Sequence, residues 1–175
     1  MATVTKTATA AAAQFGNFKA ADEKAPGTTA PDPVVKPIIL SHGTLGVIDL
    51  AQSKRFYTEF LGLDCVRHTE RGLNLRKGGY WSVVCLEIGD KVQATKLYNH
   101  WGLDVASRDE VDAAYAAALR LKDEYGIRRV NKIQISHGDY TFKLQDRDGN
   151  WWEIQYIEEP MKYDKRFARG DIIPT

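Results

Sequence analysis

The chain has 175 residues, 43% of them hydrophobic, and a formal net charge of +1 at pH 7. This length and apolar content predict one domain, or two small fused modules, with a substantial core. The near-neutral charge gives no indication of a nucleic-acid or anionic-membrane partner, and no apolar run is long enough to span a membrane.

Both ends of the chain differ in composition from the middle. Residues 1–36 are rich in Ala, Thr and Pro and lack the pattern of a secretory signal, so we expect a flexible N-terminal arm. Residues 160–175 form a charged C-terminal tail. The two cysteines, Cys65 and Cys85, lack C-x-x-C spacing. We expect reduced thiols in a cytoplasmic protein, although a single disulfide is also compatible with the sequence.

The first half of the chain, about residues 37–90, has the pattern of a βαβββ module. Asp49 followed by Gln52 is a capping-box pattern for a helix that Gly62 ends. A strand is expected before this helix and three after it, over residues 38–47, 63–69, 72–76 and 80–88.

The second half, about residues 97–159, repeats this order. Ser107 and Glu110 form a second capping box, and Gly126 ends the helix that follows over residues 110–125. The four expected strands cover residues 100–105, 129–135, 140–145 and 151–157, with an Asp-Gly turn before the last. Residues 89–98 would link the two modules, and together these elements predict an α+β fold.

A short pattern with a histidine occurs at the start of each module. His42-Gly-Thr-Leu-Gly-Val recurs 58 positions later as His100-Trp-Gly-Leu-Asp-Val. Side chains alternate faces along a strand, so each histidine lies opposite the Leu and Val that can pack on a helix. On the last strand, Glu153 lies between two apolar residues that point to the opposite face, so it has the same position relative to apolar neighbours as the two histidines. The sequence therefore predicts a metal centre formed by His42, His100 and Glu153.

Two imidazoles and one carboxylate form a facial triad, which holds a divalent metal and leaves positions open for substrate and O2 or water. These ligand types suit Fe(II), Mn(II), Zn(II) or Ni(II). A single histidine near a strand end is more often a structural residue, and it is the duplicated position that favours a metal.

The motifs H-G-T-L-G-V, F-Y-T-E-F-L-G-L, H-W-G-L-D-V and D-R-D-G-N-W-W-E-I-Q-Y resemble those of the vicinal oxygen chelate superfamily. That superfamily includes glyoxalase I, extradiol dioxygenases, fosfomycin-resistance enzymes and bleomycin-binding proteins. The resemblance covers residues 37–157 and implies two βαβββ modules that form a cupped mixed sheet around one metal. It also implies a homodimer.

The resemblance leaves the number of metal ligands open. Glyoxalase-type members add a fourth protein ligand from the fourth strand, where Cys85 and Glu87 share one parity. A site of only His42, His100 and Glu153 is similar to the Fe(II) site of extradiol dioxygenases, and we favour it. The expected function is thus a metal-dependent dioxygenase, with Fe(II) as the favoured metal, acting on a catechol, hydroquinone or enol with vicinal oxygens.

The catalytic residues expected from this resemblance are His137, Tyr140 and Lys143. His137 would act as acid or base because imidazole groups exchange protons readily near neutral pH, and Tyr140 or Lys143 would stabilise an oxyanion. Lys143 stands where the extradiol pattern has tyrosine, and Arg147 replaces the usual proline. For His137 the alternative is a turn residue beside Gly138.

Two other functions fit the same pattern. One is a metal-dependent lyase, isomerase or epimerase that does not use O2, with anion-binding arginines among Arg67, Arg71 and Arg76. The other is a small-molecule binding protein of the bleomycin-resistance type. Members of that type usually lack the metal residues, so the retention of all three argues against it.

Overall fold

The computed structural model describes residues 32–35, 37, 39–79 and 81–170. It divides into two compact units, of which one is Leu40–Pro160 and the other combines the two ends of the chain. All the predicted site residues lie in Leu40–Pro160, which we call the central unit. Most of the predicted arm, residues 1–31 and 36, lies outside the described residues. No helix of the described part is long and apolar enough to cross a membrane.

The first module forms a four-stranded sheet in the order β1-β4-β3-β2. Its β1 and β4 are parallel and its other pairs antiparallel. The predicted N-cap is confirmed, because the Asp49 side chain accepts a 2.8 Å hydrogen bond from the Gln52 backbone N–H. The elements are β1 (His42–Val47), α2 (Leu50–Arg55), η1 (Phe56–Phe60), β2 (Asp64–Thr69), β3 (Gly72–Arg76) and β4 (Ser82–Glu87).

The second module repeats this topology with strand order β5-β9-β8-β6, and β7 pairs with β8 as well. Ser107 caps its helix, as predicted, by accepting from the Glu110 backbone N–H. The predicted α+β class is therefore confirmed, with two mixed sheets. After the short η2 (Gly89–Lys91), the elements are β5 (His100–Asp104), α3 (Arg108–Arg120), α4 (Lys122–Tyr125), β6 (Arg129–Val130), β7 (Gln134–Ser136), β8 (Asp139–Gln145) and β9 (Trp151–Tyr156).

Three segments differ from the sequence prediction. The predicted helix over residues 50–61 ends in a π-helical turn, in which the Leu61 N–H donates to the Phe56 carbonyl. The predicted strand over residues 129–135 is divided into β6 and β7. Val130 and Gln134 are four positions apart, but their partners on β8 are only three positions apart, so the pairing with β8 is interrupted between them. A further helix, α5 (Lys162–Arg169), follows the central unit, where the sequence predicted only a charged tail.

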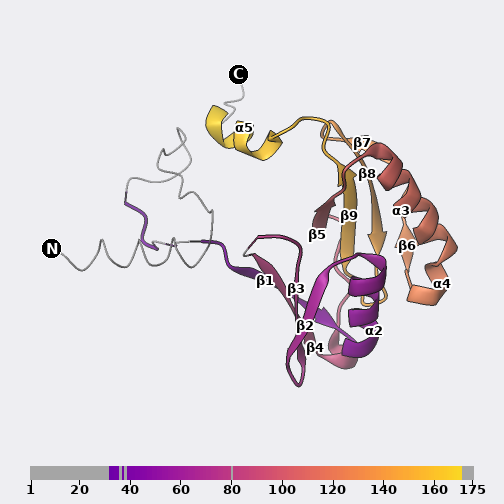
Figure 1. The fold of residues 1–175 in the computed structure, drawn as a ribbon. Coiled ribbons are helices and arrows are strands. Elements are labelled where there is room, and N and C mark those ends of the chain that lie inside the picture. The colour runs from indigo at the N-terminus through magenta and orange to yellow at the C-terminus, as the bar shows by residue number, and fades with distance from the viewer. Residues whose placement is uncertain (1–31, 36, 38, 80, 171–175) are drawn as a thin grey trace. The chain divides into compact units, whose positions relative to one another are not determined.

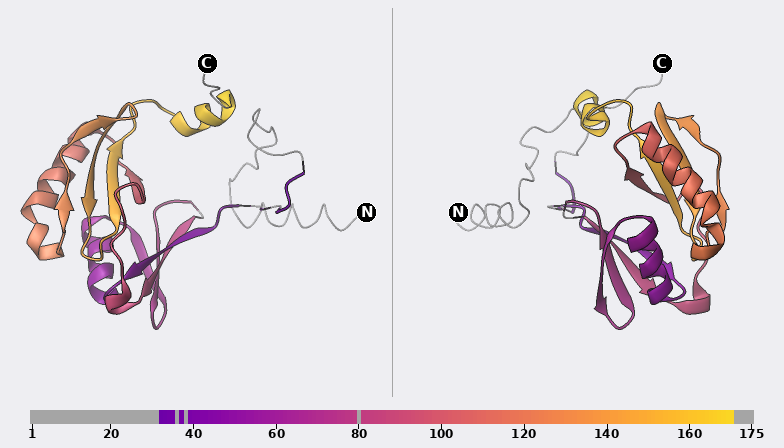
Figure 2. Two further views of the ribbon diagram at one scale, coloured as in Figure 1. Left: turned by 180° about the vertical axis from the view of Figure 1, so that it is seen from behind. Right: turned by 45° about the vertical axis from the view of Figure 1, so that its right-hand side comes forward.

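Each sheet of the central unit has its helix on one face, as Figures 1 and 2 show for α2 with the first sheet and α3 with the second. Alternate residues of the strands face these helices and form the core. On β1, Leu45 and Val47 are buried while His42 is exposed, which confirms the predicted parity. The ring of Tyr57, from η1, lies 5.4 Å from that of Trp152, so one core joins both modules.

The turn between β8 and β9 carries two buried carboxylates. Oδ1 of Asp146 accepts from the backbone N–H groups of Asp148 and Asn150, and Oδ2 accepts from the side chains of Trp152 and Tyr57. Burial raises the pKa of Asp146 to about 6, against the lowering effect of these donors. Asp148 accepts from the Ile48 N–H and, at 2.6 Å, from the Ser53 hydroxyl in the other module. These contacts fix the modules to each other.

The same turn depends on Gly149, which has a φ of 90°. A Cβ added there would lie 2.7 Å from the backbone Cα of Ala94, so both strain and a backbone clash oppose any side chain. We expect Gly149→Ala to lower the free energy of unfolding by about 2–4 kcal/mol. Urea denaturation measures this value.

Gly138→Ala is the matched control, because Gly138 has a similar φ of 86° but nothing within 4 Å of an added Cβ. Its cost should be about 1 kcal/mol, from backbone strain alone. Equal losses for the two variants would mean that the contact with Ala94 has no energetic weight.

Candidate metal centre

His100 and Glu153 lie on adjacent strands of the second sheet. Strands β5 and β9 run parallel with Gly102 opposite Glu153, so the side chains of His100 and Glu153 project from the same face. Nε2 of His100 is 2.9 Å from Oε2 of Glu153, and their side chains are 28% and 12% exposed. The structure thus brings two of the three predicted ligands into contact.

The backbone fixes the orientation of the His100 ring. Its Nδ1 is 2.9 Å from the carbonyl oxygen of Leu97. A carbonyl only accepts hydrogen bonds, so Nδ1 carries a proton and the ring directs Nε2 at Glu153. A backbone carbonyl in this position is the usual partner of a metal-binding histidine.

The pair fits a shared cation. A lone pair and a carboxylate oxygen 2.9 Å apart repel each other unless a proton or a metal lies between them. Two ligands that each lie about 2.1 Å from a divalent metal at a right angle are about 3.0 Å apart. The donor types, their separation and the oriented ring of His100 are therefore suited to a divalent metal.

The other oxygen of Glu153, Oε1, is held by two residues of β8. Oε1 is 2.5 Å from the ammonium of Lys143 and accepts from the Thr141 hydroxyl at 2.9 Å. Burial raises the pKa of Glu153, but the hydrogen bonds from Lys143 and Thr141 outweigh it and the net pKa is lowered. Glu153 is therefore an anion with Oε2 directed at His100. Both Lys143 and Glu153 are buried.

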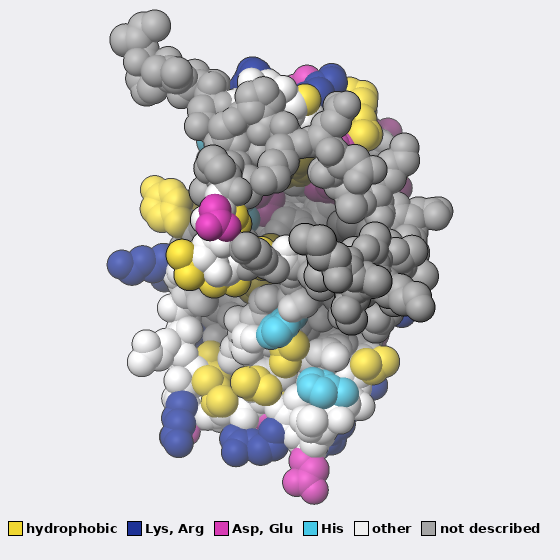
Figure 3. Space-filling view, turned by 90° about the vertical axis from the view of Figure 1, so that its left-hand side faces the viewer, with side chains coloured by type: hydrophobic (Ala, Val, Ile, Leu, Met, Phe, Trp, Pro, Cys, Tyr) yellow, Lys and Arg dark blue, Asp and Glu magenta, His cyan; other side chains and the backbone are white. Residues whose placement is uncertain are grey.

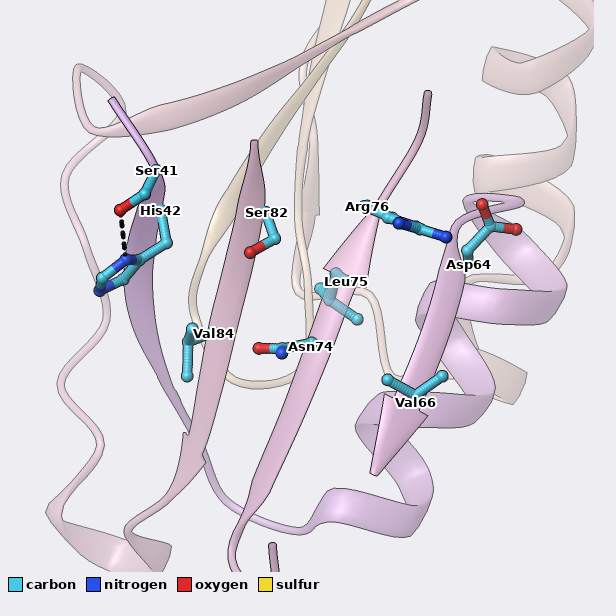
Figure 4. A pocket seen from close by; sticks show the side chains of 9 residues that line it. All are labelled: Ser41, His42, Asp64, Val66, Asn74, Leu75, Arg76, Ser82 and Val84. Atoms are coloured by element: carbon cyan, nitrogen blue, oxygen red, sulfur yellow. Dashed lines mark hydrogen bonds between the residues drawn. The ribbon is translucent and has the colours of Figure 1, made fainter. Parts of the chain in front are cut away.

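His42 lies apart from this pair. It is exposed on β1 in the first sheet, with Nδ1 2.9 Å from the Ser41 hydroxyl, and lines a pocket of about 600 Å³ formed by its own sheet (Figure 4). Histidine side chains are visible on one face of the molecule (Figure 3). Across the described residues, no three His, Cys, Asp or Glu side chains are placed to hold a metal together. The predicted triad is divided between the two sheets.

The other predicted catalytic residues lie in different places. Lys143 faces Glu153 directly, since the two residues are opposite each other on β8 and β9. Tyr140 has the opposite parity, and its hydroxyl donates at 2.8 Å to Asp112 on α3. His137 occupies the two-residue turn between β7 and β8 with a φ of 53°. This position matches the alternative considered from the sequence, in which His137 is a turn residue.

Neither residue proposed as a fourth ligand faces the site. Cys85 is fully buried on the helix side of β4, and burial raises the pKa of its thiol. Glu87 has the same parity, and its Oε2 accepts from the Leu50 N–H at the start of α2. Cys65 and Cys85 are both free thiols.

Two polar residues of the two sheet faces were not identified from the sequence. Thr141 shares the parity of Lys143 on β8, and this parity would have placed it beside Glu153. Asn74 also lines the pocket that His42 lines, and within the described part of the chain its buried Oδ1 has no hydrogen-bond partner. Nothing in the sequence marks a single Asn on a short strand as unusual.

Comparisons with known proteins agree with this architecture. The family model described as Glyoxalase/Bleomycin resistance protein/Dioxygenase superfamily matches residues 39–154. No curated protein matches the chain in sequence.

Several solved structures share the fold. A glyoxalase/bleomycin resistance protein from Albidiferax ferrireducens T118 is 22% identical with a TM-score of 0.54, covering 67% of this chain and 98% of that one. A possible glyoxalase from Bacillus cereus is 25% identical with a TM-score of 0.53 and the same coverage. A lactoylglutathione lyase from Agrobacterium tumefaciens is 18% identical with a TM-score of 0.51, and the match covers 69% of this chain and 94% of that one. With two βαβββ modules and a family match over most of its length, the chain belongs to the glyoxalase/bleomycin resistance protein/dioxygenase superfamily.

Proposed function

We propose that the protein is a metal-dependent dioxygenase acting on a small aromatic or enol compound that binds the metal through two vicinal oxygens. The observation that carries this proposal is the contact between Nε2 of His100 and Oε2 of Glu153. Their other polar atoms are already bound by the protein, so these two atoms are the ones presented to a ligand.

The number of ligands favours oxygen chemistry. On β4, the residues on the same face of the sheet as His42 are Ser82, Val84 and Leu86. None of them is a usual metal ligand. Three protein ligands leave about three positions for a chelating substrate and O2. This donor set fits Fe(II) best among Fe(II), Mn(II), Zn(II) and Ni(II), and the bound metal would lower the pKa of a substrate hydroxyl.

The protein's own residues have distinct roles in this proposal. Lys143 holds Oε1 of Glu153 and, as a buried ammonium, is the donor for an oxyanion of the substrate. His137, at the tip of the hairpin, is the candidate for proton transfer. Tyr140 has no such role here because its hydroxyl is directed at Asp112.

We further propose that His42 reaches the pair from a second copy of the chain, in a homodimer. His42 is exposed on its own sheet, and His100 with Glu153 provides only two protein ligands. A two-fold axis would supply the same contact twice, which gives two complete sites per dimer.

Anaerobic purification followed by metal analysis tests the proposed function. We expect close to one iron per chain in the wild type and a loss of at least about tenfold in His42→Ala, His100→Ala and Glu153→Ala, since each removes one of three ligands. O2 uptake should follow the addition of a catechol or hydroquinone. His68→Ala is the control, because His68 is an exposed histidine on β2 outside this site.

The outcomes separate the alternatives. Stoichiometric nickel or zinc with no O2 uptake would contradict the dioxygenase and favour a lyase, isomerase or epimerase. Absence of metal from wild type purified with each of these ions would contradict a metal centre altogether. Full metal content in Glu153→Ala would show that the assignment of the ligands is incorrect.

A further inference from the structure

The face of the first sheet that carries His42 has an ordered arrangement of polar side chains. His42 is opposite Ser82 on β4, and Arg76 on β3 is opposite Asp64 on β2. Since Leu75 pairs with Val83, Arg76 follows Ser82 across the sheet. These four residues form one line, which we call the polar row, and Figure 4 shows it across the pocket.

A second line lies directly beside the polar row. Thr44 is opposite Val84, Val84 is opposite Asn74, and Asn74 is opposite Val66. Asn74 is thus a polar side chain between two valines, and its Oδ1 is buried without a hydrogen-bond partner among the described residues. A buried acceptor without a partner destabilises the folded state. Rotation of the terminal amide would turn this oxygen to the pocket that Asn74 lines, where a ligand N–H or O–H group would satisfy it.

Arg76 lies beside Asn74 and is exposed. Asp64 is its neighbour in the register, yet no ion pair joins Arg76 to any of the residues that the structure describes. A guanidinium with free donors in a pocket is suited to a carboxylate, which it binds through two parallel hydrogen bonds.

The dimensions match one small molecule. Two strand spacings separate His42 from Arg76, a distance of about 10 Å at about 4.8 Å per strand. The pocket over these rows has a volume of about 600 Å³, within the range of ligand sites. Val84 and Val66 provide apolar surface on either side of Asn74.

We propose that this pocket binds a side arm of the substrate, and that the arm carries a hydrogen-bond donor for Asn74 Oδ1 and, beyond it, a carboxylate for Arg76. The substrate class is then a vicinal diol or enol aromatic with an acidic arm, rather than a simple catechol. The inference rests on the proposed function in one respect, since His42 would bring the chelating end of the substrate to this face.

The probes are N-(3,4-dihydroxybenzoyl)glycine, which has a chelating end, an amide N–H and a carboxylate, and its methyl ester, which lacks the charge. Calorimetric titration of the metal-loaded and the metal-free protein measures both affinities. We expect the acid to bind about tenfold more tightly than the ester, the effect of one charged hydrogen-bonded pair. Arg76→Ala should reduce this ratio to about one, and Arg76→Lys should retain part of it.

Arg67→Ala is the matched control. Arg67 lies on the neighbouring β2, but its guanidinium donates to the backbone carbonyls of Thr69 and Glu70, so the preference for the acid should remain. Equal binding of both probes, including failure of both to bind at millimolar concentration, would overturn the proposal, as would equal losses in the two arginine variants. A preference for the acid in a protein that takes up no metal would support this pocket and contradict only the proposed function.

Asn74→Val provides a second, independent measurement. Valine continues the line of Val84 and Val66 and removes the buried Oδ1, so the midpoint of thermal unfolding should rise while the affinity for the acid probe falls severalfold. A structural role for Asn74 would instead give a lower midpoint with unchanged affinity, and that result would exclude Asn74 from the subsite.

Discussion

Mixing the His42→Ala and His100→Ala variants should restore about one quarter of the wild-type metal content, although neither variant alone retains metal. With random exchange of subunits, half of the dimers are mixed, and each mixed dimer has one site with both histidines and one with neither. The recovery follows from the placement of His42 on one sheet and the His100–Glu153 pair on the other. Metal analysis of the unfractionated mixture of co-expressed variants measures it.

The pair His100→Ala with Glu153→Ala is the control for this experiment. Both residues come from the second module and contact each other, so no mixed dimer of these variants contains a complete site. Recovery in the control would show non-specific binding of metal. Absence of recovery in both mixtures, with each single variant empty, would place all three ligands within one chain.

Asp146→Asn should cause the largest loss of stability, about 3–5 kcal/mol in the free energy of unfolding. Asp146 is fully buried and uses both oxygens to accept from two backbone N–H groups and the side chains of Trp152 and Tyr57. In asparagine an NH2 group replaces one of the two carboxylate oxygens, so a hydrogen-bond donor would face the N–H or O–H groups that Asp146 now accepts from. Urea denaturation followed by tryptophan fluorescence measures the change.

Asp109→Asn is the matched control, because Asp109 is an exposed acidic residue in the first turn of α3. We expect a change of less than about 1 kcal/mol for it. A similarly small effect at Asp146 would mean that the turn between β8 and β9 tolerates an uncharged side chain, and that the modules are joined mainly by the apolar core.

The alternation of side chains was enough to predict much of the candidate site. His42, His100 and Glu153 are predicted because each opposes apolar residues on its strand. Burial agrees with this on β1, where Leu45 and Val47 are buried and His42 is exposed, whereas both parities of β9 are buried. Parity also held for β4, where Cys85 and Glu87 share one face. Parity does not say which face belongs to the helix, and only packing showed that both residues point away from the site.

The sequence by itself determined the α+β class, the two βαβββ modules, the capped helices and the alternation of side chains along each strand, because these depend on local periodicity and on residues a few positions apart. The tertiary structure decided what depends on distance between elements. It divided the triad between two sheets, placed Lys143 beside Glu153 and directed Tyr140 to Asp112. It also left Asn74 Oδ1 without a hydrogen-bond partner in the part of the chain that the structure describes. Such contacts depend on the register and relative placement of strands that are distant in the chain, which a repeated pattern alone does not specify.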